Sequence, residues 1–127
     1  MADVAVDYGR RRTGFAVFLS GVVLPIAPLR DSTWTAIEDR IRGIFRDHGT
    51  GLVVLGLPLN ASGGETELSG EVRELAAWLG ERGFDVRTVN EVRSTEEALA
   101  ERPSSARDGR TDSIAAAVIL RRFLNLP

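Results

Sequence analysis

The sequence predicts a single α/β domain built around a five-stranded mixed sheet. Three short β-like runs come first, and helical and strand-like segments alternate after them. Strands joined by tight turns pair antiparallel, whereas strands joined through helices pair parallel by right-handed crossovers. These rules predict the strand order 3-2-1-4-5, with the first three strands antiparallel and helices on both faces. At 127 residues the chain is long enough for one core and short for two, so residues 1–127 are expected to form one domain.

The first three predicted strands are residues 3–7, 14–19 and 22–29. The first strand ends in Asp7, and a polar turn precedes the second, which is rich in β-forming residues. Ser20-Gly21 is a two-residue hairpin signal between the second and third strands. Pro25 and Pro28 cannot donate to a sheet ladder, so the third strand is expected at an edge.

Helical and strand-like segments alternate from residue 32 onward. Ser32 or Thr33 can cap a helix whose apolar spacing continues to about residue 47. The uninterrupted apolar run Leu52–Gly56 is typical of a strand covered on both faces. The later predicted segments are a loop at 57–64, a helix at 65–82, a strand at 84–89, a short helix at 94–101, a polar segment at 102–111 and a last helix at 112–124.

Composition and charge exclude several classes of protein. The chain is 43% hydrophobic and 27% charged, which excludes a largely disordered protein. No apolar run approaches the ~20 residues that span a bilayer, and no secretory signal opens the sequence. The absence of cysteine fits the cytoplasm and excludes thiolate chemistry. His48 is the only histidine, which argues against a histidine metal site or a Ser-His-Asp hydrolase.

Three acidic residues fall at the ends of predicted elements: Asp7, Glu91 and Asp112. The carboxyl ends of parallel strands meet at the topological switch point of such a sheet, so Asp7 and Glu91 are expected to converge. Clustered carboxylates repel one another unless a cation is present, and their oxygens suit Mg²⁺ or Mn²⁺. Two such ions, about 4 Å apart, support phosphodiester cleavage. Taken singly, each acid is also typical of a turn or a helix cap.

Arginines and glycines beside these acids suggest phosphate contacts. All 16 basic residues are arginine, and Arg10-Arg11-Arg12 and Arg107/Arg110 flank two of the acids. The guanidinium fork binds phosphate through two hydrogen bonds, although charged turns are also commonly just solvated. The glycine-containing loop 56–64 allows close approach of its backbone to a phosphate chain. A net charge of −2 argues against a protein that coats nucleic acid non-specifically.

Four segments together resemble the motifs of the YqgF/RuvX family. They are Val6-Asp7-Tyr8-Gly9 with Arg12–Ala16, Gly56–Asn60 with Gly63, Asn90-Glu91 with Ser94-Thr95, and Asp112-Ser113 before an alanine-rich helix. The resemblance covers nearly the whole chain, in order. It implies an RNase H-like fold and nuclease activity in the 5′-end processing of precursor 16S ribosomal RNA or on Holliday junctions.

The resemblance also implies roles for individual residues. Asp7, Glu91 and Asp112 are expected as catalytic, metal-binding acids for Mg²⁺ or Mn²⁺, with two ions. The charge pattern, and not the resemblance, makes Arg10, Arg11 and Arg12 expected substrate contacts. Asn60, Ser94 and Arg110 lie in or beside the motifs and are also expected to contact substrate. Asp108, four residues before Asp112, is a candidate fourth acid on its position alone. Asn90 stands where the family usually has Asp, and Arg93 is displaced by one position, so substrate contacts near Glu91 are expected to differ.

The sequence raises three alternative functions, one of which its length disfavours. A Holliday junction resolvase is expected to act as a symmetric dimer on its two-fold substrate, whereas the precursor-RNA nuclease could be a monomer or a homodimer. An actin-like ATPase would need a second domain, for which 127 residues leave no room. A non-catalytic RNA-binding or ribosome-assembly module is favoured only by the altered segment 90–93.

Overall fold

The computed structural model describes residues 1–92 and 113–126 in full, together with the helical backbone at 110–112. Its elements are β1 (Asp3–Asp7), β2 (Thr13–Leu19), β3 (Val22–Leu29), α1 (Trp34–His48), β4 (Val53–Leu59), α2 (Glu67–Glu81), β5 (Val86–Val92) and α4 (Arg110–Phe123). The strands form one sheet in the order β3-β2-β1-β4-β5. β2 is antiparallel to both β1 and β3, whereas β4 is parallel to both β1 and β5. The predicted RNase H-like strand order and directions are therefore confirmed.

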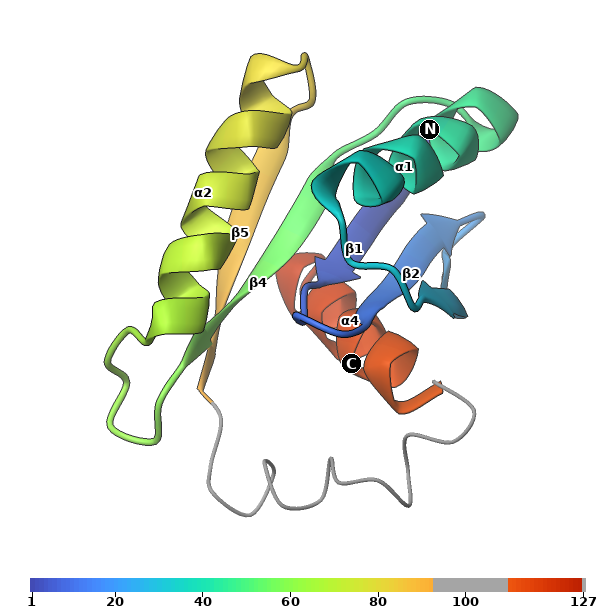
Figure 1. Cartoon of the computed structure of the whole chain (residues 1–127). Coiled ribbons are helices and arrows are strands. Elements are labelled where there is room, and N and C mark those ends of the chain that lie inside the picture. Colours follow the sequence, from blue (N-terminus) through green and yellow to red (C-terminus); the bar gives the residue numbers. More distant parts are fainter. Residues whose placement is uncertain (93–109, 127) are drawn as a thin grey trace.

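The helices cover both faces of the sheet. Figure 1 shows β1 at the centre, α1 and α2 over one face, and α4 over the other. One core cluster gathers the apolar residues of α1 and α2 against the sheet, and a second gathers those of α4. Along β1, Val4 and Val6 belong to the first cluster and Ala5 to the second, because successive side chains of a strand point to opposite faces. Among the described residues, no helix combines the length and apolarity needed to cross a bilayer.

Several element boundaries differ from the sequence prediction. β4 continues through Leu59, because Leu57 and Leu59 are buried and pair with β5, where a loop was expected. β5 extends to Val92, so Glu91 lies within the strand instead of after it. The last helix begins at Arg110, which places Asp112 in its first turn and not at its start. The expected short helix at 94–101 lies outside the described residues.

α1 and α2 pack together over their shared face. The rings of Trp34 and Trp78 lie 5.5 Å apart, so the two tryptophans pack against each other between the helices. Glu38 of α1 is buried and forms ion pairs with Arg42 at 2.7 Å and Arg82 at 2.8 Å. Hydrogen bonds, from Arg82 first and then from Arg42, hold the pKa of this carboxyl below its usual range.

Candidate active site

Asp7 and Glu91 lie on the face of the sheet that α4 covers. Asp7 is the last residue of β1, and the alternation of a strand places it on the same face as Ala5, which packs in the α4 cluster. Glu91 comes two residues after Val89, which packs in the same cluster. Both acids are near the carboxyl ends of parallel strands, with only β4 between those strands. The sequence prediction that they share one end of the sheet is confirmed.

Gly56 occupies the strand between the two acids. Val6 pairs with Leu55, so Gly56 stands at the level of Asp7. A Cβ atom on Gly56 would lie 2.4 Å from Cδ1 of Ile119 and 3.7 Å from Cγ of Glu91. The missing side chain therefore lets α4 and Glu91 approach β4 here. Neighbouring strands are about 4.8 Å apart, so the backbones of β1 and β5 are separated by about 10 Å. Glu91 pairs with Pro58, two residues beyond Gly56, and its side chain reaches back toward Gly56.

A cation from the protein itself lies beside Glu91. Its Oε1 atom is buried and is 3.1 Å from Nη1 of Arg122 in the last turn of α4. The side chain of Glu91 is 16% exposed, whereas that of Arg122 is 59% exposed. This carboxylate therefore has a positive group at its inner oxygen.

Ser113 fixes the start of α4 above β2 and β3, on the same face of the sheet. Its hydroxyl donates to the carbonyl oxygen of Ile26 and accepts from the backbone N–H of Phe15 at 3.5 Å. Phe15 follows Gly14, which pairs with Asp7. The first turn of α4, to which Asp112 belongs, thus lies close to the Asp7 end of β1. From there α4 crosses the sheet until Ile119 lies over Gly56 and Arg122 reaches Glu91.

Two of the three expected metal-binding carboxylates, Asp7 and Glu91, are described. Their oxygens are donors of the type that hard divalent cations favour. Within residues 1–92 and 113–126, no three His, Cys, Asp or Glu side chains form a group that could hold a metal ion. Asp112, the third acid expected beside Asp7 and Glu91, has its side chain outside the described residues. Asp3 shows the contrasting case of a structural acid on the same face, because its Oδ1 accepts from the N–H of Leu52 at 2.9 Å.

The β1–β2 turn carries the three arginines predicted to bind substrate. Arg10 donates from Nε to Oε2 of Glu71 on α2 at 2.8 Å, and this bond raises the pKa of the guanidinium. Arg10 therefore ties the turn to α2. Arg11 is exposed and Arg12 half-buried. A Cβ on Gly9 would lie 2.5 Å from the carbonyl oxygen of Arg12, so the turn is tight enough to require glycine there.

Asn60 organises the loop between β4 and α2. Its Oδ1 accepts from the N–H of Ser62 at 3.0 Å and of Gly64 at 2.8 Å, a side-chain turn that Asn forms readily. Asn60 was expected to contact substrate, but its Oδ1 atom accepts hydrogen bonds within the loop. Ser69 was missed by the sequence reasoning: it is buried, completes a capping box with Thr66 and donates to the carbonyl of Pro58.

Three predicted site residues lie wholly or partly outside the described residues. Ser94 and Asp108 lie outside the described residues, and of Arg110 only the helical backbone is described. Sequence reasoning also missed the roles of Ser113 and Arg122. Ser113 belongs to the fourth family-like motif, and Arg122 follows Arg121 near the end of the chain. Neither pattern indicates a contact with a distant strand.

A sheet in this order, with acids at the carboxyl ends of two parallel strands, defines an RNase H-like α/β protein. The profile of the RuvX family, described as Holliday junction resolvase, matches residues 1–126, and the chain belongs to this family. A protein of Pseudomonas syringae pv. tomato is 30% identical over 131 residues, covering 96% of this chain and 90% of that protein. One of Oleidesulfovibrio alaskensis is 38% identical over 136 residues, covering 100% and 94%. Both carry the name "Putative pre-16S rRNA nuclease".

A solved structure of a viral nuclease is similar to part of this chain. The large terminase nuclease from the thermophilic phage G20c aligns with a TM-score of 0.48 at 17% identity, over 70% of this chain and 44% of that one.

Proposed function

We propose that this protein is a metal-dependent endonuclease of the cytoplasm that hydrolyses phosphodiester bonds in the 5′-end processing of precursor 16S ribosomal RNA. The observation that carries the proposal is the placement of Asp7 and Glu91 on one face of the sheet, with Gly56 between them. Ligands of open α/β sheets bind beyond the carboxyl ends of the strands, which is where these two acids lie. The names of the similar proteins support the choice of substrate.

Asp7, Glu91 and Asp112 would hold the Mg²⁺ or Mn²⁺ ions, two in number. When bound, such ions lower the pKa of water and offset negative charge on the phosphate and the leaving oxygen. Hard cations of this kind favour carboxylate oxygens, which is the donor type that this chain supplies.

The protein's own groups position the acids. The β1–β2 pairing fixes Asp7 opposite Gly14, and Ser113 anchors α4 beside that pair. Arg122, in contrast, pairs with the inner oxygen of Glu91 and would compete there with a bound cation. Arg11 and Arg12 extend from the adjacent turn, where guanidinium groups can bind the phosphates that flank the scissile bond.

Cleavage of Holliday junctions is a second candidate function, favoured by the description of the RuvX family. A four-way junction has two-fold symmetry, so this activity calls for a homodimer. A non-catalytic RNA-binding role is the alternative outcome if neither substrate is cut.

The test compares wild type with Asp7→Asn on precursor 16S ribosomal RNA and on a four-way DNA junction, with and without Mn²⁺. We expect the wild type to cut the RNA only with Mn²⁺, and Asp7→Asn to lose cleavage while keeping its circular dichroism spectrum. Asp3→Asn is the matched control for chemistry, because Asp3 lies on the same strand and face but bonds to the backbone. Full activity of a well-folded Asp7→Asn protein would contradict the mechanism.

A further inference from the structure

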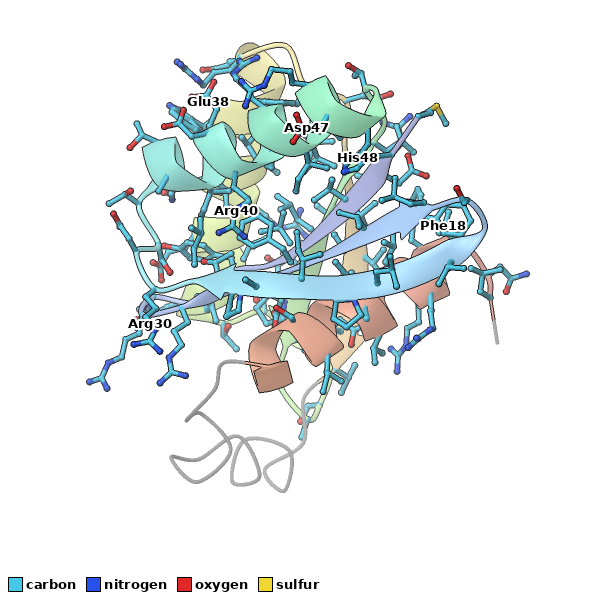
Figure 2. All side chains as sticks on the ribbon, turned by 90° about the vertical axis from the view of Figure 1, so that its right-hand side faces the viewer. Phe18, Arg30, Glu38, Arg40, Asp47 and His48 are labelled. Carbon is cyan, nitrogen blue, oxygen red and sulfur yellow. The ribbon has the colours of Figure 1, made fainter. Side chains whose placement is uncertain are left out.

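Arg30 lies at the end of the sheet that carries Asp7. In the β2–β3 ladder Thr13 pairs with Leu29, and Arg30 is the next residue along the chain after this terminal pair. Asp7 pairs with Gly14, one residue further along β2. Figure 2 shows Arg30 at one end of the strands, extending away from the ribbon, with Phe18 and His48 toward the opposite end.

The segment that carries Arg30 is held in place by bonds that do not involve its guanidinium. The hydroxyl groups of Thr13 and Ser32 are 2.9 Å apart, which fastens the segment to β2. The neighbouring carboxylate of Asp31 accepts from the N–H of Thr33 at 3.0 Å at the start of α1. Arg30 itself is exposed, and within the described part of the chain it forms no ion pair. Its position is therefore fixed by the backbone, and its charge remains available.

Most other described arginines differ from Arg30 in this respect. Seven of them form ion pairs with acids: Arg10, Arg42, Arg46, Arg73, Arg82, Arg87 and Arg122. Arg40 is half-buried, donates to the carbonyl of Ala27, and has its pKa lowered by burial. Arg11 shares with Arg30 an exposed side chain that forms no ion pair among the described residues, and both lie at the Asp7 end of the sheet.

We propose that Arg30, together with Arg11, binds the sugar-phosphate backbone of the nucleic acid beside the scissile bond. Both guanidinium groups are exposed and form no ion pair among the described residues, so each can donate hydrogen bonds to a phosphate oxygen. β3 is two strands away from β1, or about 10 Å, which equals the axial rise of about three base pairs of a duplex. Arg11 and Arg30 together define a proposed phosphate track. It runs from Asp7 across β2 to the β3–α1 connection. This inference rests on the proposed function for its reference point, the acids.

The test measures binding, so that it does not depend on cleavage. Asp7→Asn protein, with and without Arg30→Gln, is titrated with a fluorescently labelled single-stranded RNA from the 16S leader and with a labelled four-way DNA junction, each at several salt concentrations. We expect Arg30→Gln to weaken binding roughly threefold to tenfold and to reduce the slope of log K against log[salt] by about 0.7 to 0.9, the effect of one lost phosphate contact. The arm with the larger change identifies the nucleic acid that follows this track.

Arg46→Gln in the same background is the matched control. Arg46 is 78% exposed and lies near His48, at the far end of α1 from Arg30. Equal salt slopes for Arg30→Gln and Arg46→Gln, or no binding by the Asp7→Asn protein, would overturn the inference about Arg30. Binding by wild type without cleavage would overturn the proposed nuclease function alone, while the salt slopes would still decide the role of Arg30.

Discussion

Nη1 of Arg122 lies 3.1 Å from Oε1 of Glu91, which joins the last turn of α4 to the carboxyl end of β5. The contact places the positive guanidinium of Arg122 beside Glu91, one of the two acids that lie on the same face of the sheet. It gives α4 a role at both of its ends, because Ser113 at the other end is bonded beside Asp7.

Replacing Arg122 with glutamine is expected to tighten Mn²⁺ binding. The substitution removes a cation that competes for Glu91, and a partly exposed pair of this kind corresponds to about a twofold to fivefold change in affinity. Isothermal titration with Mn²⁺ measures the change. Arg121→Gln is the control, since it removes the same charge from the neighbouring exposed position. Unchanged affinity in Arg122→Gln would show that Glu91 is not a metal ligand.

Gly56→Ala is expected to destabilise the protein by about 1–3 kcal/mol. The new methyl group would lie 2.4 Å from Cδ1 of Ile119, which is 1% exposed and has little room to move. The displacement would reach Glu91 as well, so cleavage should fall along with stability. Urea unfolding measures the first effect.

Gly70→Ala provides the comparison for Gly56→Ala. Gly70 is exposed in α2, and a Cβ added to it would meet no heavy atom within 4 Å, so alanine there should stabilise the helix by up to about 1 kcal/mol. Equal unfolding free energies for the two variants would refute close packing of α4 against β4.

The strand order and the convergence of Asp7 and Glu91 at one end of the sheet could both be predicted from the sequence. Alternation along residues 3–7 and the two helical crossovers determine the central strand and the end at which acids converge. The end of β5 could not be predicted, because its pairing with Leu57 and Leu59 is a contact between distant segments. The same limitation applies to Ser113 and Arg122, whose partners lie 98 or 87 residues away for the former and 31 for the latter.

Glu71→Gln is expected to strengthen nucleic-acid binding roughly threefold. The substitution releases the guanidinium of Arg10, which now donates to Glu71 at 2.8 Å, and so adds one cation to the proposed phosphate track. Binding of the labelled leader RNA by the Asp7→Asn protein measures the gain, and Arg10→Gln should abolish it. Weaker binding in Glu71→Gln would instead assign Arg10 to holding the turn against α2.

Glu38→Gln is expected to lower stability at neutral pH and to have a smaller effect in acid. Glu38 is 4% exposed, and its pKa in the folded protein is depressed by Arg82 and then Arg42. A carboxyl with a depressed folded pKa stabilises the fold above its unfolded pKa of about 4.3, and the contribution is lost as pH falls through the folded pKa. The gap in unfolding free energy between wild type and Glu38→Gln should therefore be largest near pH 7 and narrow below about pH 4, as measured by urea titration.

The matched control for Glu38→Gln is Glu65→Gln. Glu65 also has its pKa lowered by an arginine, Arg73, but its side chain is 50% exposed and screened by water. Its substitution should cause the smaller loss at pH 7, because the arginine left behind in that pair is hydrated. In contrast, Glu38→Gln leaves two arginines facing each other across the α1–α2 interface. A loss that is equal for both variants, or one that does not vary with pH, would show that burial of Glu38 contributes nothing to the stability of this helix pair.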